Sequence, residues 1–569
     1  MKWFTRSRRV ATPIDPDEIF IDASNLPAFS RDRFEGRIED PIRKRMVLSV
    51  GVLAAVAFLV FGVRLAHLQI IDSEKYVAIS EQNRLGRVPI FAARGVIYDR
   101  NGIELAWNVP LHSAATTTAF TLPLSRQYRQ THGFAHLMGY VTLPRADRSG
   151  NYYRTDVSGI AGVESAYNTE LKGVNGSRIE ETDAMGSVVS GNIIEPPVDG
   201  ASVYLAIDAR LEEALYDSIQ SVAQVSGFVG GAGVIMDVES GELLALTSYP
   251  EYDPNIMVAA TDTAMIASYQ DSNRAPFLNR AISGLFVPGS IVKPFVALGA
   301  LAEGVITASK QIESTGVMRV PNPFYPGRFS TFVDWRAHGF VDMRRALAVS
   351  SDIYFYQVGG GFGNQRGIGI ANIEKYSRLF GMGSITGIAV SGEADGVIPN
   401  PKWKEETFDD QWRVGDTYNT SIGQYGFLVT PLQMARATAA LANRGTLLTP
   451  SLIKTDTPSG QSIAGIPIEA YQVVHEGMHM AVTEGTAAAL LIPGVSVAAK
   501  TGTAQVGMEN EFVNSWVVGF YPYEKPRYAF ALLLERAPAG PPQGAPAAMR
   551  QFLERVVREL PEHLGPAVE

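Results

Sequence analysis

Three short motifs in the second half of the chain carry residue types suited to nucleophilic catalysis. The first is Ser290-Ile291-Val292-Lys293, which lies between Pro288-Gly289 and Pro294. If a helix begins near Ser290, the serine hydroxyl and the lysine amine lie on one face, one turn apart. The helix N-terminus favours developing negative charge, and a buried, neutral lysine can take the serine proton. The pattern indicates a serine nucleophile with a lysine base, although by itself it also fits a helix N-cap with a surface lysine.

The other two motifs are Ser350-Ser351-Asp352, which follows a helical run, and Lys500-Thr501-Gly502-Thr503, which follows an apolar, strand-like stretch. Gly502 would let another backbone or a substrate approach the strand closely. Taken singly, these motifs also fit a loop N-cap and a strand end with a solvated lysine. Their order, with 60 residues from 290 to 350 and 150 from 350 to 500, favours one composite site.

The composition excludes several other chemistries. The chain has no cysteine, which rules out thiolate zinc sites, disulfides and cysteine nucleophiles. A net charge of −9 argues against broad binding to nucleic acid. With 569 residues, 46 % of them hydrophobic and 19 % charged, we expect two or three globular units with real cores.

One segment predicts a membrane anchor. From Met46 to Val63 the chain is apolar and uncharged, which is long enough to span the hydrocarbon core. Lys and Arg are denser before this run than after it, so the N-terminus is expected in the cytoplasm and the ectodomain outside. A cleaved signal peptide is the alternative, because Ala55-Val56-Ala57 resembles a cleavage site. That site lies inside the apolar run, however, after an unusually long leader.

Alternating and helical patterns organise the rest of the chain. Hairpins are expected at 94–102 with its Asn-Gly turn, at 233–247 and at 516–534. Apolar residues recur at helical spacing from Met549 to Leu560, so the last helix should dock on the sheet. The predicted fold class is α+β and multidomain: a flexible cytoplasmic tail (1–45), a transmembrane helix (46–65), a small mixed domain (66–226) and a large domain of antiparallel sheet flanked by helices (227–562).

Together the three motifs resemble the signature of β-lactamases and penicillin-binding proteins. Further strings extend the resemblance over nearly the whole chain. Arg94–Gly102 and Gly162-Val163-Glu164 are similar to the pedestal of class B penicillin-binding proteins, and Asn279-Arg280-Ala281 and Thr430–Gln433 to their transpeptidase domain. Asp334–Tyr356 is most similar to the elongation subgroup, penicillin-binding protein 2.

The resemblance implies a serine-type D,D-transpeptidase that cross-links peptidoglycan stem peptides without a cofactor. Ser290 would attack the carbonyl of the penultimate D-alanine, and Lys293 would accept its proton. Ser350 would relay protons to the leaving D-alanine and from the incoming amine. β-Lactams mimic the donor peptide and would trap Ser290.

The same resemblance assigns the Lys500–Thr503 strand to substrate binding. Lys500 and Thr501 would hold the donor's terminal carboxylate in a charge-assisted contact. Gly502 and Thr503 would line the substrate's path, and the backbone N–H groups of Ser290 and Thr503 would form the oxyanion hole.

Asp352 and the pair Asp334 and His338 raise separate questions. Most of the wider family has Asn at position 352; a carboxylate cannot donate a hydrogen bond to a substrate carbonyl, but it can hold Lys293 or another cation. Asp334 and His338 could contribute to a zinc site, as some elongation-type relatives do with help from a cysteine. Two ligands do not make a structural zinc site, so a hydrogen-bonded pair is favoured and no metal is expected.

Several alternatives stay open. A septal transpeptidase of the same class shares the fold and the chemistry, whereas a β-lactam-sensing receptor would need further membrane segments and an effector domain. The expected location is the bacterial inner (plasma) membrane, crossed once. Expected partners are a glycan polymerase of the shape, elongation, division and sporulation (SEDS) family and an elongation-complex scaffold, both bound through the pedestal. The acceptor amine is left open, and so is the meaning of Gly423-Gln424-Tyr425-Gly426, which resembles a family Gly-Gln-Gly loop with one residue altered.

Overall fold

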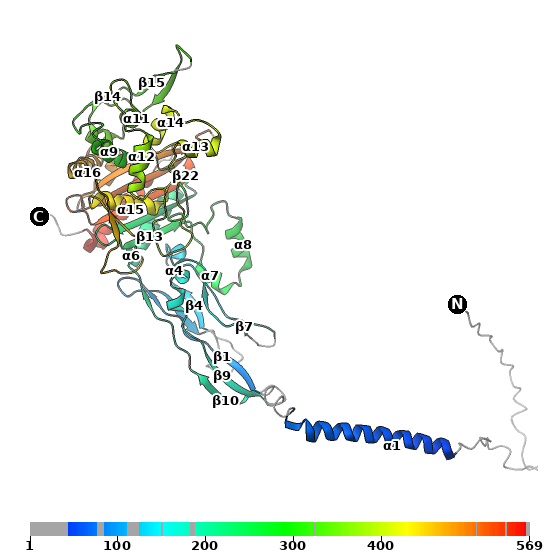
Figure 1. Ribbon diagram of the computed structural model, residues 1–569. Coiled ribbons are helices and arrows are strands. Elements are labelled where there is room, and N and C mark those ends of the chain that lie inside the picture. The colour runs from blue at the N-terminus through cyan, green and yellow to red at the C-terminus, as the bar shows by residue number, and fades with distance from the viewer. Residues whose placement is uncertain are drawn as a thin grey trace, which may run out of the picture. The chain divides into compact units, whose positions relative to one another are not determined.

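The structure is a computed structural model that describes residues 44–564, except 75, 77–84, 111–123, 149–151, 183–187, 323–324, 508 and 541–542. The expected tail therefore lies outside the described residues apart from its last two. By its internal contacts the chain divides into two compact units. One comprises Met1–Gly86 and Glu181–Val189, and the other comprises Arg87–Glu180 and Ser190–Glu569 (Figure 1).

The first unit contains the helix α1 (Lys44–Ala66), which continues into the π-helical turn η4 (His67–Ile71). No residue of α1 is buried within the chain. Together the two segments form the one described helix that is long and apolar enough to cross a membrane. Its residues are the ones expected from the uncharged run in the sequence.

The second unit begins with a small mixed region. Its four-stranded sheet has the order β11 (Val203–Tyr204), β2 (Ile97–Tyr98), β3 (Glu104–Pro110) and β4 (Leu124–Tyr128). β2 and β3 are antiparallel and joined by the turn at Gly102, where φ is +86°, so the predicted hairpin is confirmed. The other described elements here are β1 (Leu85–Ile90), α3 (Ala135–Met138), β5 (Val141–Thr142), β6 (Arg145–Ala146), β7 (Tyr152–Arg154), β8 (Ser158–Gly159), α4 (Gly162–Ala166), α5 (Asn168–Leu171), β9 (Gly176–Thr182) and β10 (Val188–Glu195).

A buried ion cluster ties this small region together. The Nε atoms of Arg94 and Arg126 donate to the two carboxylate oxygens of Glu164 at 2.5 and 2.7 Å. All three side chains are at most 2 % exposed. Two guanidinium groups on one carboxylate satisfy its lone pairs, and such a charge-assisted network holds α4 against the hairpin strands. Two of the strings that resemble the pedestal therefore meet in one cluster.

The larger region is built on a five-stranded antiparallel sheet with the order β13-β12-β22-β21-β20. Its strands are β12 (Gly230–Asp237), β13 (Leu243–Tyr249), β20 (Ala498–Val506), β21 (Phe512–Tyr521) and β22 (Tyr528–Pro538). The two hairpins predicted in this region are therefore confirmed. Helices α6 (Ala209–Ser226) and α17 (Ala545–Glu559) pack on each other and on the sheet, and α17 buries Met549, Phe552 and Val556 as its periodicity predicted.

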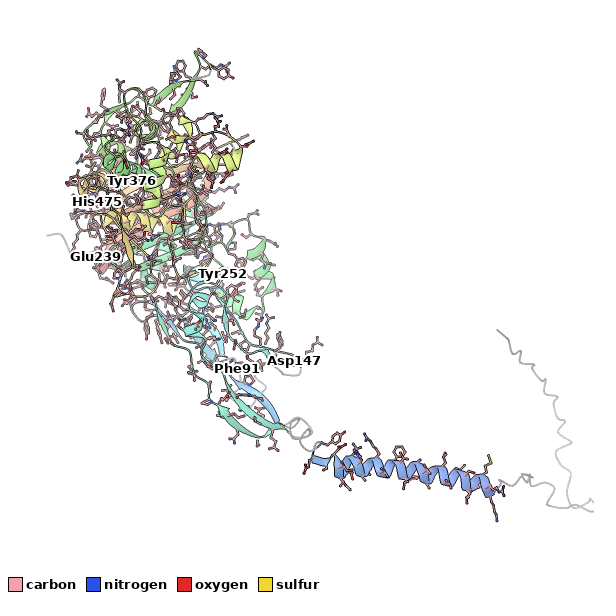
Figure 2. The ribbon with its side chains drawn as sticks, in the orientation of Figure 1. Phe91, Asp147, Glu239, Tyr252, Tyr376 and His475 are labelled. Atoms are coloured by element: carbon pink, nitrogen blue, oxygen red, sulfur yellow. The ribbon has the colours of Figure 1, made fainter. Side chains whose placement is uncertain are left out.

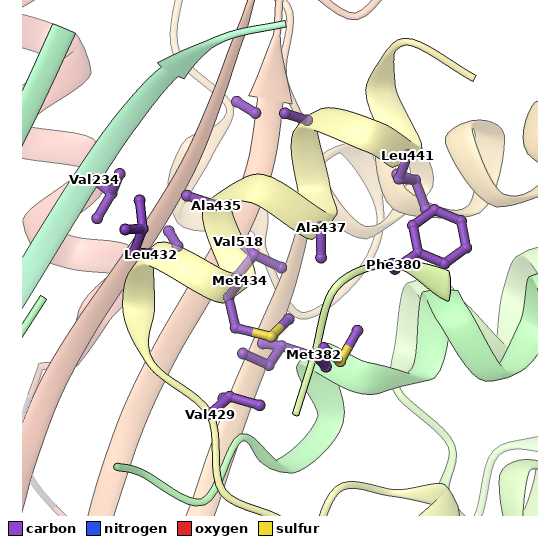
Figure 3. Close-up of a cluster of buried hydrophobic side chains, with 14 of the residues drawn as sticks. Val234, Phe380, Met382, Val429, Leu432, Met434, Ala435, Ala437, Leu441 and Val518 are labelled. Carbon is purple, nitrogen blue, oxygen red and sulfur yellow. The ribbon is translucent and has the colours of Figure 1, made fainter. Parts of the chain in front are cut away.

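Helix α15 (Pro431–Ala442) covers β12, β21 and β22 from the other side of the sheet and is buried at every position. It begins with a capping box: Gln433 N donates to Thr430 Oγ1, and Thr430 N donates to Gln433 Oε1. Figure 3 shows Leu432 and Met434 of this helix beside Val234 of β12 and Val518 of β21. This apolar layer fixes the sheet against the helices that carry the site.

Those helices are α9 (Lys293–Ala302), α10 (Met343–Val349), α11 (Asp352–Gly360), α14 (Val414–Ser421) and α16 (Ile468–Thr483). Figure 2 labels His475, which lies on α16, and Tyr376, which lies on the neighbouring segment α12 (Ile370–Leu379). The remaining described elements are α7 (Pro254–Ala259), α8 (Thr263–Asp271), β14 (Ile312–Ser314), β15 (Val317–Pro321), β16 (Phe329–Val333), β17 (Gly339–Val341), α12 (Ile370–Leu379), α13 (Pro401–Phe408), β18 (Thr446–Leu448), β19 (Gly460–Ser462), η6 (Ala488–Leu490) and η7 (Pro561–His563).

Candidate active site

The first motif forms a tight helical entry. Ser290 lies in the 3₁₀ turn η5 (Gly289–Val292), which runs directly into α9 at Lys293. Residues three apart are eclipsed in a 3₁₀ turn, so Ser290 and Lys293 share one face as predicted. Gly289 has φ +60°, and its N–H donates to the carbonyl of Gly423 at 2.9 Å. Pro294 occupies the first turn of α9, where no intrahelical acceptor is lost.

Lys293 is fully buried and donates three hydrogen bonds. Its Nζ donates to Asp352 Oδ1 at 2.6 Å, to the carbonyl of Ser350 at 2.9 Å and to Ser350 Oγ at 3.3 Å. No hydrogen bond of the Ser290 hydroxyl is found among the described residues. Asp352 therefore acts as the partner of the lysine, and its carboxylate adds a negative charge that an amide acceptor would lack.

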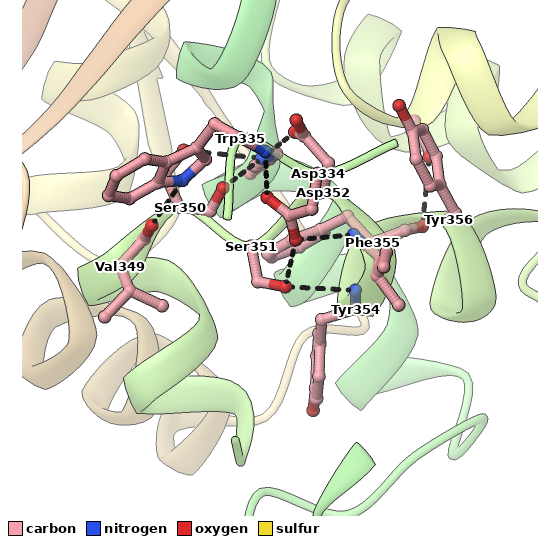
Figure 4. A network of polar contacts seen from close by, with 12 residues as sticks. Asp334, Trp335, Val349, Ser350, Ser351, Asp352, Tyr354, Phe355 and Tyr356 are labelled. Carbon is pink, nitrogen blue, oxygen red and sulfur yellow. Dashed lines mark hydrogen bonds and ion pairs between the residues drawn. The ribbon is translucent and has the colours of Figure 1, made fainter. Parts of the chain in front are cut away.

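The second motif joins two helices in one sharp turn. Ser350 ends α10 in the left-handed conformation, with φ +58°, and Ser351 caps α11 by accepting a hydrogen bond from Tyr354 N. A non-glycine residue at positive φ is strained and persists only where its surroundings enforce it. Figure 4 shows Ser350 and Ser351 in this turn. The turn caps α11 and also holds the Ser350 hydroxyl between the amines of Lys293 and Lys500.

The third motif lies on β20, as the sequence predicted. Lys500 is fully buried, and its Nζ donates to Ser350 Oγ and to the Thr501 carbonyl, each at 2.8 Å. Burial, and next the positive charge of Lys293, lower the pKa of Lys500 well below its usual value. Two amines therefore share one serine hydroxyl, and the environment favours the neutral form of Lys500.

Glycines let β20 lie directly on the nucleophile turn. A Cβ added to Gly502 would lie 2.8 Å from the Pro288 carbonyl oxygen, and one added to Gly289 would lie 3.0 Å from the Thr503 carbonyl oxygen. The predicted close approach at Gly502 is therefore confirmed, with the backbone before Ser290 as its neighbour. Any side chain at Gly502 would push the strand away from the nucleophile.

One helix braces all three motifs. α16 packs against α9, α10 and β20, the elements that carry or lead into them. At Gly477 an added Cβ would lie 2.9 Å from the Leu347 side chain, and at Gly485 it would lie 2.1 Å from the Ala348 carbonyl oxygen. These small residues seat the end of α10, and so Ser350, against the segment that leads to β20.

Asp334 holds the second motif by hydrogen bonds. Its Oδ2 accepts from Ser351 Oγ at 2.8 Å, from Ser314 Oγ at 3.1 Å and from Ile353 N at 3.1 Å. The next residue, Trp335, donates its Nε1–H to the Val349 carbonyl at 3.1 Å. Both sides of the Ser350 turn are therefore fixed from the Asp334-Trp335 segment (Figure 4).

His338 does not complete a hydrogen-bonded pair with Asp334. Its Nε2 lies 3.5 Å from Asp334 Oδ1, longer than a hydrogen bond, and has no other partner. Burial lowers the pKa of His338. Within the described part of the chain no group of three or more His, Asp and Glu side chains could hold a metal ion. The residues present do not fit a zinc site, because serines fill the surroundings of Asp334.

The motifs open on one cavity of about 1030 Å³. Of the predicted site residues, the buried lysines Lys293 and Lys500 and the histidine His338 do not line this cavity. All the others do, Asp334 among them. Its lining residues are Ser290, Val333, Asp334, Trp335, Ser350, Asp352, Tyr356, Asn419, Ile422, Gln424, Tyr425, Thr486, Thr501, Gly502, Thr503, Gln505, Asn510, Val513, Ser515, Trp516, Gly540, Gln543, Gly544 and Pro546.

Among the lining residues that the sequence did not assign to the site, Thr486 and Tyr425 stand out. Thr486 Oγ1 accepts a hydrogen bond from Thr501 Oγ1 at 2.8 Å and so orients a residue expected to bind substrate. Thr486 lies in the Glu-Gly-Thr segment after α16, and no local pattern distinguishes it from a turn. Tyr425 carried one signal, the altered Gly-Gln-Gly loop, whose meaning the sequence did not give.

This arrangement, a serine at a helix entry with two buried lysines around a second serine, defines the class of the protein. The chain matches the penicillin binding protein transpeptidase domain over residues 231–554 and the penicillin-binding protein dimerisation domain over residues 116–205. It belongs to the penicillin-binding protein transpeptidase family.

Individual relatives indicate which subgroup of this family the chain resembles most. The peptidoglycan D,D-transpeptidase MrdA of Acinetobacter baumannii is 30 % identical, over 88 % of this chain and 85 % of that protein. The structure of Pseudomonas aeruginosa PBP2 in complex with WCK 5153 matches with a TM-score of 0.67 at 30 % identity, over 84 % of this chain and 98 % of that one.

A second structure, the complex between PBP2 and MreC from Helicobacter pylori, has a TM-score of 0.68 at 25 % identity, over 83 % of this chain and 99 % of that one. The peptidoglycan D,D-transpeptidase FtsI of Escherichia coli is 27 % identical over 86 % of each chain, a weaker match. The expected similarity to penicillin-binding protein 2 is therefore confirmed over the alternative within the class.

Proposed function

We propose that this chain is the elongation-type peptidoglycan D,D-transpeptidase of its cell, and that it works through an acyl-enzyme on Ser290. The observation that carries the proposal is the meeting of Ser290, Lys293, Ser350 and Lys500 around one cavity, from segments up to 210 residues apart (290 to 500). Family membership and the named relatives support the substrate, a peptidoglycan stem peptide.

In the first half-reaction Ser290 Oγ attacks the carbonyl of the penultimate D-alanine, and its proton passes to Lys293. The developing oxyanion is bound by the backbone N–H groups of Ser290, on the turn η5, and Thr503, on β20, which are segments in contact. Such a donor is worth about 2.7–4 kcal/mol in comparable acyl transfer. The C–N bond then breaks, the leaving D-alanine amine takes a proton through Ser350, and an ester remains on Ser290.

The shared hydroxyl of Ser350 explains how Lys293 becomes a base. In the free site Lys293 donates to Asp352 and to Ser350, as an ammonium does, while burial favours neutral Lys500. A donor carboxylate bound beside Thr501 raises the proton affinity of Lys500, because opposite charges stabilise each other. A proton then moves from Lys293 through Ser350 Oγ to Lys500, and neutral Lys293 can accept the proton of Ser290.

In the second half-reaction an amine of another stem peptide attacks the ester. Ser350 takes a proton from this amine and passes one to Lys293, the ester C–O bond breaks, and Ser290 takes that proton from Lys293. The product is a cross-link between two stem peptides. A β-lactam enters the first half-reaction in the same way, but the opened ring stays attached and blocks the second.

Anchoring and partners follow from the first unit and from the small region. α1 crosses the inner (plasma) membrane once, with the N-terminus in the cytoplasm and the rest outside. The pedestal (66–226) and the transpeptidase domain (227–562) then lie on the side where peptidoglycan is built. The H. pylori complex of PBP2 with MreC supports an elongation-complex partner, and a solved peptidoglycan synthase complex that coordinates polymerization and crosslinking supports a glycan polymerase as second partner, for which we propose the SEDS family.

The test is covalent labelling of the detergent-solubilised full chain with fluorescent penicillin. The wild type should label in a one-to-one ratio, and Ser290→Ala should not label at all. Ser268→Ala, which removes an exposed hydroxyl on α8, is the matched control and should label like the wild type. A folded wild type that does not label, or a Ser290→Ala variant that does, would contradict the proposal.

A further inference from the structure

Tyr425 holds a backbone conformation that a bulky residue rarely adopts. Its φ is +61°, in the left-handed region, where a side chain costs about 1–3 kcal/mol of strain. Its neighbours Gly423 and Gly426 also have φ of +77°. The two glycines adopt such angles without strain. The backbone of Tyr425 is strained there, and the contacts of its side chain must offset that strain.

The loop is fixed from both ends. The carbonyl of Gly423 accepts the N–H of Gly289, the residue before the nucleophile, and a Cβ on Gly423 would lie 2.1 Å from the Gly289 carbonyl oxygen. At the other end, a Cβ on Gly426 would lie 2.2 Å from the Trp403 ring. The ring of Tyr425 is therefore tied, through two residues of backbone, to the turn that carries Ser290.

Three groups hold the Tyr425 ring itself. Trp403 and Trp412 meet it edge to face, with centroids 6.0 and 5.8 Å away. The Nζ atom of Lys404 lies 5.6 Å from the ring centroid. Cation and aromatic contacts of this kind orient a ring firmly.

Lys404 is in turn immobilised. Its side chain is 4 % exposed and pairs with Asp416 at 2.7 Å and Asp410 at 3.0 Å. α13, the loop after it and the start of α14 thus form a frame around one tyrosine. None of the frame residues lines the cavity, but Tyr425 does.

The chemistry of the cavity lining indicates what the Tyr425 ring can contact. No lysine or arginine is among the lining residues that the structure describes, so this lining offers an incoming donor hydroxyls, amides, two carboxylates and aromatic rings. Apart from β20, the lining comes mainly from the Val333–Trp335 segment, α11, α14, the Gln424-Tyr425 loop, β21 and the segment that leads into α17. β20 carries the residues proposed to bind the donor's carboxylate, so the donor's other groups must contact lining residues outside this strand, and Tyr425 offers an aromatic ring there.

We infer that Tyr425 is a specificity-determining residue that packs its ring against the acyl side chain of the donor held at Ser290. The inference rests on the proposed function, because it needs acylation at Ser290. The strained backbone, the tryptophan and lysine frame and the link to Gly289 all serve to present this ring at a fixed distance from the nucleophile.

The experiment pairs a change in the protein with a change in the ligand. Benzylpenicillin carries an aromatic acyl side chain, and 6-aminopenicillanic acid has the same bicyclic lactam without it. The second-order rate constant of acylation is measured for both ligands on the wild type, Tyr425→Phe, Tyr425→Ala and Tyr425→Gly. Tyr153→Ala, which removes an exposed ring on β7 away from the frame and from the cavity lining, is the matched control.

Tyr425→Ala should acylate about tenfold more slowly with benzylpenicillin and within about twofold of the wild type with 6-aminopenicillanic acid. Tyr425→Gly should show the same selective loss although its backbone is unstrained, and Tyr425→Phe and Tyr153→Ala should behave like the wild type. Equal losses with both ligands, or none with either, would overturn the inference. If the wild type itself is not acylated by either ligand, the proposed function fails instead.

Discussion

Two regions of the transpeptidase domain bury a lysine, and they treat its charge in opposite ways. Beneath Tyr425, Lys404 is paired with the carboxylates of Asp416 and Asp410. Burial by itself lowers the pKa of Lys404, but the hydrogen bonds to these two partners outweigh burial and raise it. Lys404 therefore stays positively charged, and its role is structural.

At the catalytic cavity, Lys500 has Ser350 Oγ and the Thr501 carbonyl as its hydrogen-bond partners and no carboxylate within ion-pair distance among the described residues. The nearest carboxylate network belongs to Lys293, through Asp352. Burial and the charge of Lys293 therefore lower the pKa of Lys500. The comparison shows that a buried lysine has a lowered pKa, and can exchange a proton, where the fold provides no carboxylate beside it.

The largest expected effect comes from replacing each lysine by methionine. Lys500→Met should slow acylation on the order of 10²–10⁴-fold, because it removes a member of the proton path. It should leave the free energy of unfolding equal or higher, because an uncompensated buried amine is lost. Stopped-flow acylation and urea denaturation measure the two quantities.

Lys404→Met should do the reverse. It leaves Asp416 and Asp410 without their buried cation, and should lower the free energy of unfolding by about 2–3 kcal/mol, since Asp410 is partly exposed. Acylation of 6-aminopenicillanic acid should change by less than about tenfold. If Lys500→Met destabilises and Lys404→Met does not, the comparison between the two regions is wrong.

The next effect concerns the donor's carboxylate. A stem-peptide donor whose terminal carboxylate is replaced by an amide cannot draw a proton onto Lys500, so Lys293 stays protonated. We expect kcat to fall about 100-fold, more than KM rises. Steady-state kinetics with the two donors checks this. A donor amide that raises KM alone would mean that Lys500 only binds the carboxylate.

A smaller effect is expected at Asp334. Asp334→Asn keeps the size of the side chain but puts an NH₂ group where a carboxylate oxygen accepts three N–H or O–H groups. The Ser350 turn should loosen, and acylation should slow about tenfold. His338→Ala is the control, because the ring nitrogen nearest Asp334 makes no hydrogen bond, and it should acylate like the wild type.

The smallest effect is on the pH dependence of stability. Below 10.5, the usual pKa of lysine, the unfolded chain binds a proton at position 500 that the folded chain binds only below its lowered pKa. Folding is therefore favoured as the pH rises through that window. The stability advantage of Lys500→Met should shrink with rising pH in urea denaturation. Lys404 has a raised pKa, so its contribution is full below 10.5 and is lost only as the pH rises through the raised value.

The parts of the fold that local patterns encode were predictable. The hairpin strands β12 and β13 are apolar runs joined by a short polar turn, and α17 shows its apolar stripe at helical spacing. The three motifs were likewise found by residue type, since each needs only neighbouring residues to be recognised. Their meeting in one cavity followed from the family resemblance and not from any local pattern.

What escaped prediction depends on contacts between distant segments. The residues around Thr486 do not predict its hydrogen bond to Thr501. The residues around Ser351 do not predict that Asp334 accepts its hydrogen bond. The frame of Tyr425 comes from the stretch 403–416, which no local pattern places beside the 423–426 loop, and the strained backbone of Tyr425 cannot be read from residue type. The expected Asp334–His338 hydrogen bond does not form: the oxygen nearest the His338 ring, Asp334 Oδ1, accepts from Trp335 N, while Oδ2 accepts from the two serines.

The most direct measurement is to locate the covalent adduct. The wild-type chain is acylated with benzylpenicillin, digested and mapped by mass spectrometry. We predict a single adduct on the peptide that contains Ser290, with none on the peptide that contains Ser350 and Ser351. An adduct on Ser350 or Ser351, or at any serine outside the cavity, would contradict the assignment of Ser290 as the nucleophile.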